Sequence, residues 1–168
     1  MKRQIIKVEI KPDKEQKNLI EREIKCTRFV YNYFVKKRYE IWKTERKNIT
    51  FEEEKEILKK LKKENVWLKN VENATLEQAI RDLDSDYYKF FKLDGEYPKY
   101  RKKDDKEQWY KTRNVNNSIK IHKKQNLITL PVLDLVKMET TEKLSGKVGY
   151  VKINKNGDKY EALLTIER

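Results

Sequence analysis

The chain has 168 residues, enough for one large domain or two small ones with a hydrophobic core. Charged residues make up 41% of it and the formal net charge is +13, which favours a polyanionic partner, nucleic acid first and an anionic membrane surface second. Its 3 Trp, 10 Tyr and 5 Phe argue against disorder, because chains that cannot bury apolar surface seldom carry so many aromatic residues.

The first predicted element is a half-buried strand over residues 3–10. Its apolar residues alternate with charged ones, which is the two-residue period of a strand. These apolar residues are Ile6, Val8 and Ile10. Pro12 ends the strand, and Asp13 with Gln16 three residues later has the form of a helix N-terminal cap.

Three helical segments follow. Residues 14–43 carry apolar residues at helical spacing, as one helix or as two with a break near residues 26–28. Thr50 and Glu53 have the spacing of a capping box, which predicts a second helix to about residue 64. Asn73 is a good N-terminal cap for a third helix, which we expect to extend to about residue 92.

The remaining residues predict strands. Apolar residues alternate in two short segments, at Ile119 and Ile121 and at Ile128 and Leu130. The last residues predict a hairpin around Asn156-Gly157, which is a strong turn signal. Its first arm alternates at Val148, Tyr150 and Lys152, and its second at Tyr160, Ala162, Leu164 and Ile166.

One strand therefore precedes the helices and several follow them. A lone strand is not stable by itself, so the first strand should pair with the later ones. That pairing makes the helices an insertion into a β domain. We expect an α+β fold, with a β domain formed by residues 1–11 and 95–168 and a helical domain formed by residues 12–94.

Few residues suggest catalysis or metal binding. The only histidine, His122, lies in a Lys-rich strand region without a nucleophile beside it, and the single Cys26 excludes an internal disulfide. Asp82 and Asp86 share a helix face, but solvated carboxylates commonly do. The sequence has no Cys/His cluster for zinc and no glycine-rich phosphate loop. We therefore expect no catalytic site, no metal and no cofactor.

No stretch of the sequence suggests a membrane protein. It has no signal peptide and no apolar run of membrane-span length. We expect a cytoplasmic protein that has no membrane partner.

Charge is unevenly spread along the chain. Residues 14–47 hold eleven Lys or Arg against five Asp or Glu, residues 99–124 hold ten against three, and residues 72–86 hold one against five. Within the basic segments aromatic residues lie between the cations, a pattern typical of phosphate contact combined with base stacking. We expect at least half of the apolar set Phe29, Val30, Tyr33 and Phe34 to lie in the core.

Several motifs follow one another along the chain. They are Lys11-Pro12 after the first strand, the run Cys26–Tyr33, Trp67-Leu68, the run Leu76–Leu83, Phe90-Phe91, Pro98-Lys99-Tyr100, the run Asn116–Ile119, Leu130-Pro131, and Gly146-Lys147-Val148 with the strand Tyr160–Glu167. Taken together and in this order, they resemble the N-terminal half of TnpB, the OrfB-type protein of insertion sequences and a relative of type V CRISPR effectors.

The resemblance implies a fold and partners. The fold is an oligonucleotide-binding-like β-barrel, called the wedge domain, with a helical recognition domain inserted after the first strand. The partners are a guide RNA and duplex DNA beside a short target-adjacent motif. In that family a RuvC-like nuclease domain begins just after a strand like residues 161–167, and this chain ends at Arg168. We therefore expect no nuclease activity.

The resemblance also implies residues that read the target-adjacent motif. It places them near Phe51 and Lys55, near Ala74 and Glu77, and in the loop at Val115 and Asn116. Only Asn116 keeps a typical residue. Ala74 and Glu77 stand where the family has an aromatic residue and an amide, so we expect a different motif to be read, or none.

Our leading hypothesis is a nuclease-less module of TnpB type that binds guide RNA and target DNA. Besides Phe51, Lys55 and Glu77, the residues predicted to contact nucleic acid are Arg28, Asn32, Lys36, Arg38, Lys99, Arg101, Lys102, Lys103, Lys111, Arg113 and Asn116. Alternatives are a DNA-binding regulator that uses the first helices as a helix-turn-helix, and a partner or inhibitor of a separate TnpB-like nuclease. A decayed reading frame or a fragment is a fourth.

Overall fold

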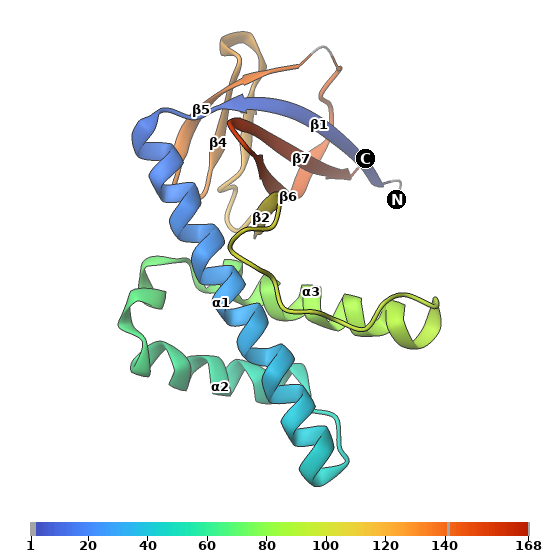
Figure 1. Ribbon diagram of the computed structural model, residues 1–168. Coiled ribbons are helices and arrows are strands. Elements are labelled where there is room, and N and C mark those ends of the chain that lie inside the picture. Colours follow the sequence, from blue (N-terminus) through green and yellow to red (C-terminus); the bar gives the residue numbers. More distant parts are fainter. Residues whose placement is uncertain (1–2, 141, 168) are drawn as a thin grey trace. The chain divides into compact units, whose positions relative to one another are not determined.

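The structure is a computed structural model that describes residues 3–140 and 142–167. It is an α+β fold that divides into two compact units (Figure 1). The sheet unit comprises residues 1–24 and 104–168, and the helical unit comprises residues 25–103. Each unit has a hydrophobic cluster of its own.

The sheet unit is built on seven antiparallel strands in the order β2-β6-β7-β1-β5-β4-β3. The strands are β1 (Arg3–Lys11), β2 (Glu107–Arg113), β3 (Lys120–His122), β4 (Leu127–Leu130), β5 (Asp134–Glu139), β6 (Lys147–Asn156) and β7 (Lys159–Glu167). Strand β1 pairs with β7 on one side and β5 on the other, which confirms that the first strand joins the later ones. The ladder is open, because it ends at β2 and β3.

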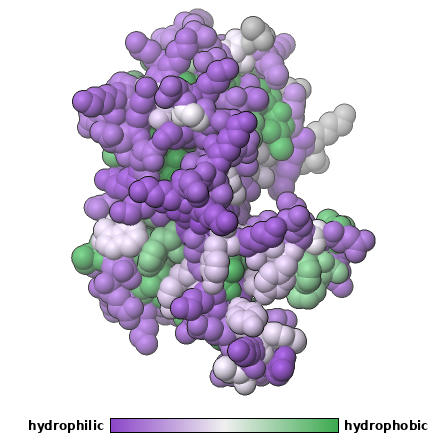
Figure 2. All heavy atoms as spheres, viewed as in Figure 1, coloured by the Kyte–Doolittle hydropathy of each residue, from purple (hydrophilic) through white to green (hydrophobic). Residues whose placement is uncertain are grey.

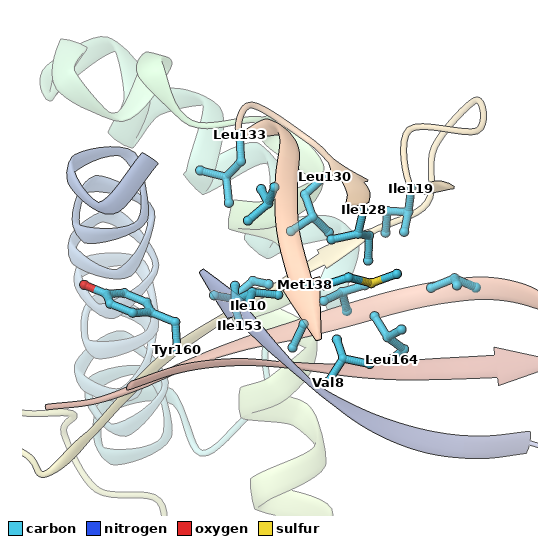
Figure 3. Packing of buried hydrophobic residues seen from close by; sticks show 14 of the residues in the cluster. Val8, Ile10, Ile119, Ile128, Leu130, Leu133, Met138, Ile153, Tyr160 and Leu164 are labelled. Atoms are coloured by element: carbon cyan, nitrogen blue, oxygen red, sulfur yellow. The ribbon is translucent and has the colours of Figure 1, made fainter. Parts of the chain in front are cut away.

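The core of the sheet unit follows the alternation of β1. Ile6, Val8 and Ile10 are buried, and the residues of β7 opposite them are Leu164, Ala162 and Tyr160. Residues opposite each other in a ladder point to the same face, so this face of the sheet becomes continuously apolar. Figure 3 shows Val8, Leu130 and Ile153, from three strands, pointing into one cluster.

Strand β6 departs from the predicted alternation. The sequence predicted Val148, Tyr150 and Lys152 on one face, but the buried residues are Val148, Val151 and Ile153. A β-bulge between Val148 and Tyr150 adds one residue and exchanges the two faces beyond it. The predicted hairpin is confirmed, with Asn156 paired to Lys159 and Gly157 in the turn at a φ of 63°.

Helix α1 (Lys14–Glu45) runs through the boundary between the two units without the break that the sequence allowed near residues 26–28. The cap at its start is confirmed: Gln16 N donates to Asp13 Oδ1 at 2.8 Å, and Asp13 N donates to Gln16 Oε1 at 3.0 Å. The first turns bury Ile20 in the sheet unit, and the later turns bury Phe34 in the helical unit.

The rest of the helical unit is α2 (Phe51–Glu64), the 3-10 helix η1 (Val66–Asn70) and α3 (Asn73–Lys92); a short 3-10 helix η2 (Lys123–Gln125) lies in the sheet unit. The capping box of α2 is confirmed, because Glu53 N donates to Thr50 Oγ1 at 3.2 Å and Thr50 N donates to Glu53 Oε1 at 3.3 Å. The cap predicted at Asn73 is wrong by one residue. Glu72 occupies that position, and the Asn73 amide donates to Glu77 inside the helix.

Hydrophilic side chains cover most of the face shown in Figure 2, and pale and green side chains gather over the helices of the helical unit. Within residues 3–140 and 142–167, none of the helices combines the length and the apolar character needed to cross a membrane.

We predict that Thr50→Ala lowers the free energy of unfolding by about 1 kcal/mol, because it leaves the amide of Glu53 at the start of α2 without its acceptor. Urea unfolding followed by circular dichroism measures the change. Thr50→Asp keeps a cap oxygen and should retain most of the stability. Equal losses in the two variants would contradict a stabilising cap.

Candidate nucleic-acid interface

The helical unit has an open groove along one face of α1. We call it the α1 groove, and it is lined by Lys25, Arg28, Phe29, Asn32, Tyr33, Lys36, Trp67 and Tyr100. The α1 members recur three or four residues apart, so they lie on the same side of the helix. Three of the lining residues are cations and none is a carboxylate. The groove therefore offers positive charge beside aromatic surface.

Aromatic rings form one wall of the α1 groove. The rings of Phe29 and Trp67 meet edge to face with centroids 4.8 Å apart, and Lys25 Nζ lies 5.5 Å from the Trp67 centroid. Val30 and Phe34 are fully buried on the other side of α1, which confirms that half of the predicted apolar set is core. Phe29 and Tyr33, the other half, line the groove.

Asn32 fixes the chain that follows α3. Its amide donates to Arg101 O at 2.8 Å and accepts from Arg101 N at 2.7 Å. These two bonds hold the backbone beside Tyr100, whose ring is half-exposed in the α1 groove. Asn32 therefore positions a groove residue through hydrogen bonds to the backbone.

The Arg101 side chain packs inside the helical unit. Its guanidinium lies 3.9 Å from the centroid of Tyr31 and 3.8 Å from Asp82 Oδ2, and only 16% of the side chain is exposed. Burial lowers the pKa of Arg101, and the charge of Asp82 opposes that shift. The Tyr31 hydroxyl donates to Asp86 at 2.6 Å. Burial raises the pKa of Tyr31 most, and the hydrogen bond to Asp86 raises it further.

Arg38 forms an ion pair within the helical unit. Its Nε donates to Glu54 Oε2 at 2.8 Å and its Nη2 donates to both Glu54 and Asp84. The Arg38 side chain is 13% exposed and Glu54 is fully buried. Burial raises the pKa of the Glu54 carboxyl, and the Arg38 guanidinium opposes that rise. Arg38 thus neutralises a buried acid between α1 and α2.

Helices α2 and α3 carry four of the residues that the family resemblance assigned to motif reading, namely Phe51, Lys55, Ala74 and Glu77. Arg81 lies 4.3 Å over the ring of Phe51, and Lys62 at the other end of α2 donates to Asn73 at 3.2 Å. These contacts make the helices antiparallel (Figure 1). Lys55 on α2 and Glu77 on α3 lie between these two contacts along their helices. Ala74 and Glu77 are half-buried.

Several of these groups already have partners close in sequence. Lys55 pairs with Glu52 at 3.2 Å, and Glu77 accepts from Asn73 at 3.1 Å. Nothing in the sequence pattern singled out Arg81, whose partner is thirty residues away.

The other predicted cations lie on the surface of their units. Lys99 is exposed and pairs with Glu96 at 3.3 Å, and Lys102 and Lys103 are exposed next to it in the chain. In the sheet unit, Lys111 lies 5.6 Å from the ring centroid of Trp109, and Arg113 is exposed at the end of β2.

Asn116 lies in a tight turn after β2. Asn116 and Asn117 both have positive φ, 55° and 59°, and Ser118 N donates to Val115 O at 3.1 Å to close the turn. Asparagine tolerates this backbone conformation better than most residues. The side chain of Asn116 is exposed at the tip.

A second basic pocket lies beside this turn. It is lined by Asn114, Asn117, Ile119, Lys120, Ile121, His122, Lys123, Leu144, Ser145, Gly146, Lys147 and Val148. Its lining has three lysines and no carboxylate. Lys120 and Lys123 lie in a basic segment of the sequence but were not among the predicted contact residues. Lys147 lies at the start of β6.

The residues that the structure describes hold no group of three or more His, Cys, Asp or Glu that could bind a metal ion. His122 Nε2 lies 2.8 Å from Thr129 Oγ1 on the neighbouring strand β4, where Thr129 pairs with Lys120 in the ladder.

Known proteins share this sequence in part. Residues 1–47, which form β1 and α1, match the family model of a helix-turn-helix domain of the OrfB, IS605 type. The chain is 30% identical over 92 residues, 54% of its length, to a "Putative RNA-guided DNA endonuclease" of Streptomyces pristinaespiralis. It is 24% identical over 163 residues, 95% of its length, to the "Putative RNA-guided DNA endonuclease InsQ" of Escherichia coli K12.

Over these ranges the chain is similar to OrfB-type proteins. It resembles their N-terminal part, and the matches cover 23% of the Streptomyces protein and 40% of the Escherichia coli protein. The chain thus spans less than half the length of either of these two relatives.

We predict that Arg38→Met lowers the free energy of unfolding by roughly 3–5 kcal/mol, because it leaves Glu54 charged and buried without a partner. Adding Glu54→Leu should recover most of the loss, since an apolar pair can replace a buried ion pair. Chemical denaturation measures both effects. If Arg38→Met kept wild-type stability, the ion pair would not have the structural role assigned to it.

Proposed function

We propose that the chain is a nucleic-acid-binding module of TnpB type, which binds guide RNA and, beside a short motif, duplex DNA. The observation that carries the proposal is the α1 groove, where Lys25, Arg28 and Lys36 lie along one helix face among aromatic side chains. Cations contact phosphates whatever the sequence, and aromatic rings stack on unpaired bases. The names of the two relatives support RNA and DNA as the polymers.

The proposal assigns different roles to the predicted residues. Arg28 and Lys36 contact phosphates directly in the α1 groove, whereas Asn32, Arg38 and Arg101 hold the helical unit in shape. The remaining predicted contacts are to the polymer at the rim of each unit, from Phe51, Lys55, Glu77, Lys99, Lys102, Lys103, Lys111, Arg113 and Asn116. The basic pocket beside the 115–118 turn supports a second contact region on the sheet unit.

We further propose that residues 1–11 and 95–168 form an oligonucleotide-binding-like wedge domain and residues 12–94 a recognition domain. The pairing of β1 with β7 and β5, with the helices between them in sequence, supports this order. Apolar residues of all seven strands pack in or against one cluster, which supports the proposal of a partly open barrel.

For these 168 residues we propose binding rather than cleavage. Each unit has a basic groove or pocket suited to binding. A separate nuclease subunit would be the partner that supplies cleavage. Mixing the purified chain with labelled duplex DNA and Mg²⁺ tests this point, with intact DNA as the expected result.

A second candidate is a regulator that binds duplex DNA alone, favoured by the match of residues 1–47 to a helix-turn-helix model. Ribonuclease treatment of the purified protein separates the two functions. Loss of DNA binding together with a copurifying RNA supports the first function. DNA binding that survives removal of RNA supports the second.

We predict that replacing Lys25, Arg28 and Lys36 together by Gln weakens RNA binding and makes it less sensitive to salt. Each lost phosphate contact should lower the slope of log affinity against log salt by about 0.7–0.9. Filter binding over a salt series measures this slope.

The matched control replaces three exposed lysines of α2, Lys59, Lys60 and Lys63, by Gln. It removes the same charge outside the α1 groove and should change the slope less. Equal slopes for the two variants would show that net charge, and not the groove, governs binding. Wild-type affinity that is indifferent to salt would overturn the proposed function itself.

A further inference from the structure

A second pocket of the helical unit lies on a different side of α1 from the α1 groove. We call it the aromatic pocket, and it is lined by Arg38, Trp42, Asn48, Ile49, Asp84, Tyr87, Phe90, Phe91 and Tyr97. On α1, Arg38 is rotated by about 200° from Lys36, at roughly 100° per residue. The aromatic pocket has a volume of about 540 Å³, which falls in the range of small-molecule binding sites.

The walls of the aromatic pocket are rings that pack on one another. Phe90 meets Tyr97 edge to face at 5.2 Å, Tyr87 meets Tyr97 at 5.6 Å, and Tyr87 stacks on Phe91 at 6.3 Å. A hydrogen bond of 3.3 Å links the Tyr87 and Tyr97 hydroxyls. The rings therefore hold one another in place before any ligand binds.

These rings are unusually open to solvent. The exposed fractions are 48% for Trp42, 69% for Phe91 and 43% for Tyr97. Scattered exposed apolar residues are ordinary, but several large rings around one concave site mark a binding surface. The open faces of Trp42 and Phe91 are thus available for stacking.

Polar groups line the same pocket. The Asp84 carboxylate, which accepts from Arg38, is 47% exposed, and the amide of Asn48 lines the loop side. An apolar side chain bound here would remove water from Asn48 and from the exposed part of Asp84 without replacing its hydrogen bonds, at a cost in free energy. A nucleobase instead presents flat faces to the rings and donors and acceptors at its edge.

One cation lies beside a ring of the pocket. The Arg46 guanidinium lies 5.9 Å from the ring centroid of Trp42. Positive charge beside stacking rings is the combination found in single-strand binding sites.

We propose that the aromatic pocket binds an unpaired nucleobase of a single-stranded RNA segment. The base stacks on the open face of Phe91 or Trp42, and its edge meets Asp84 and Asn48. The pocket selects unpaired over paired RNA, because a base inside a duplex cannot present its face. This inference rests on the proposed function and adds a selectivity that the α1 groove does not supply.

The test uses the full 168-residue chain and two probes, a labelled single-stranded RNA and the same RNA annealed to its complement. Phe91→Ala should weaken binding to the single strand by about tenfold and leave binding to the duplex unchanged. Tyr88→Ala is the matched control, because Tyr88 is 60% exposed on the same helix but does not line the pocket. Thermal unfolding should show that both variants remain folded.

A second readout uses a single strand that contains 2-aminopurine, a fluorescent base. The fluorescence of 2-aminopurine falls when the base stacks on an aromatic ring. The wild type and Tyr88→Ala should quench it, and Phe91→Ala should quench it less. Equal effects of Phe91→Ala on single strand and duplex, or none on either, would overturn the pocket assignment while groove-dependent binding stood. A wild type that binds neither probe would overturn the proposed function instead.

Discussion

The pairing of β1 with β7 is the constraint on which the rest of the structure depends. It joins residues near the start of the chain to residues near position 164, so the sheet unit forms only when both are in place. The chain leaves the sheet after Lys11, forms the helices, and returns to the sheet at Glu107. Both ends of this excursion are hydrogen-bonded strands, and the helical unit lies between them in the sequence. Its groove and pocket are formed by its own residues.

Local patterns predicted those parts of the fold that local chemistry decides. The alternation in β1 and β7 and the caps at Asp13 and Thr50 depend on residues within a few positions of each other, and all are present. Apart from the cap predicted at Asn73, which lies one residue away at Glu72, the failures depend on distant partners. The bulge in β6 follows from its register against β7, and β2 and β5 bury too few apolar residues to reveal a period. Continuity of α1 near residue 26 is decided by packing on two separate cores.

The candidate site was predictable to a similar extent. Cations on one face of α1 follow from helical spacing, so Arg28 and Lys36 could be named and do lie together. The same spacing could not show that Arg38 meets Glu54, since that acid lies on another helix. Trp67 and Tyr100 enter the groove from η1 and from the chain after α3, and only tertiary structure brings them there.

The three tryptophans of the chain fall on three different surfaces. Trp42 lines the aromatic pocket and Trp67 lines the α1 groove, while Trp109 lies on the sheet unit with Lys152 Nζ 4.5 Å from its ring centroid. Each surface thus contains its own natural fluorophore. Versions of the chain that keep one tryptophan and carry Phe or Tyr at the other two would report occupancy surface by surface. The emission of each would show where along the molecule a bound strand lies.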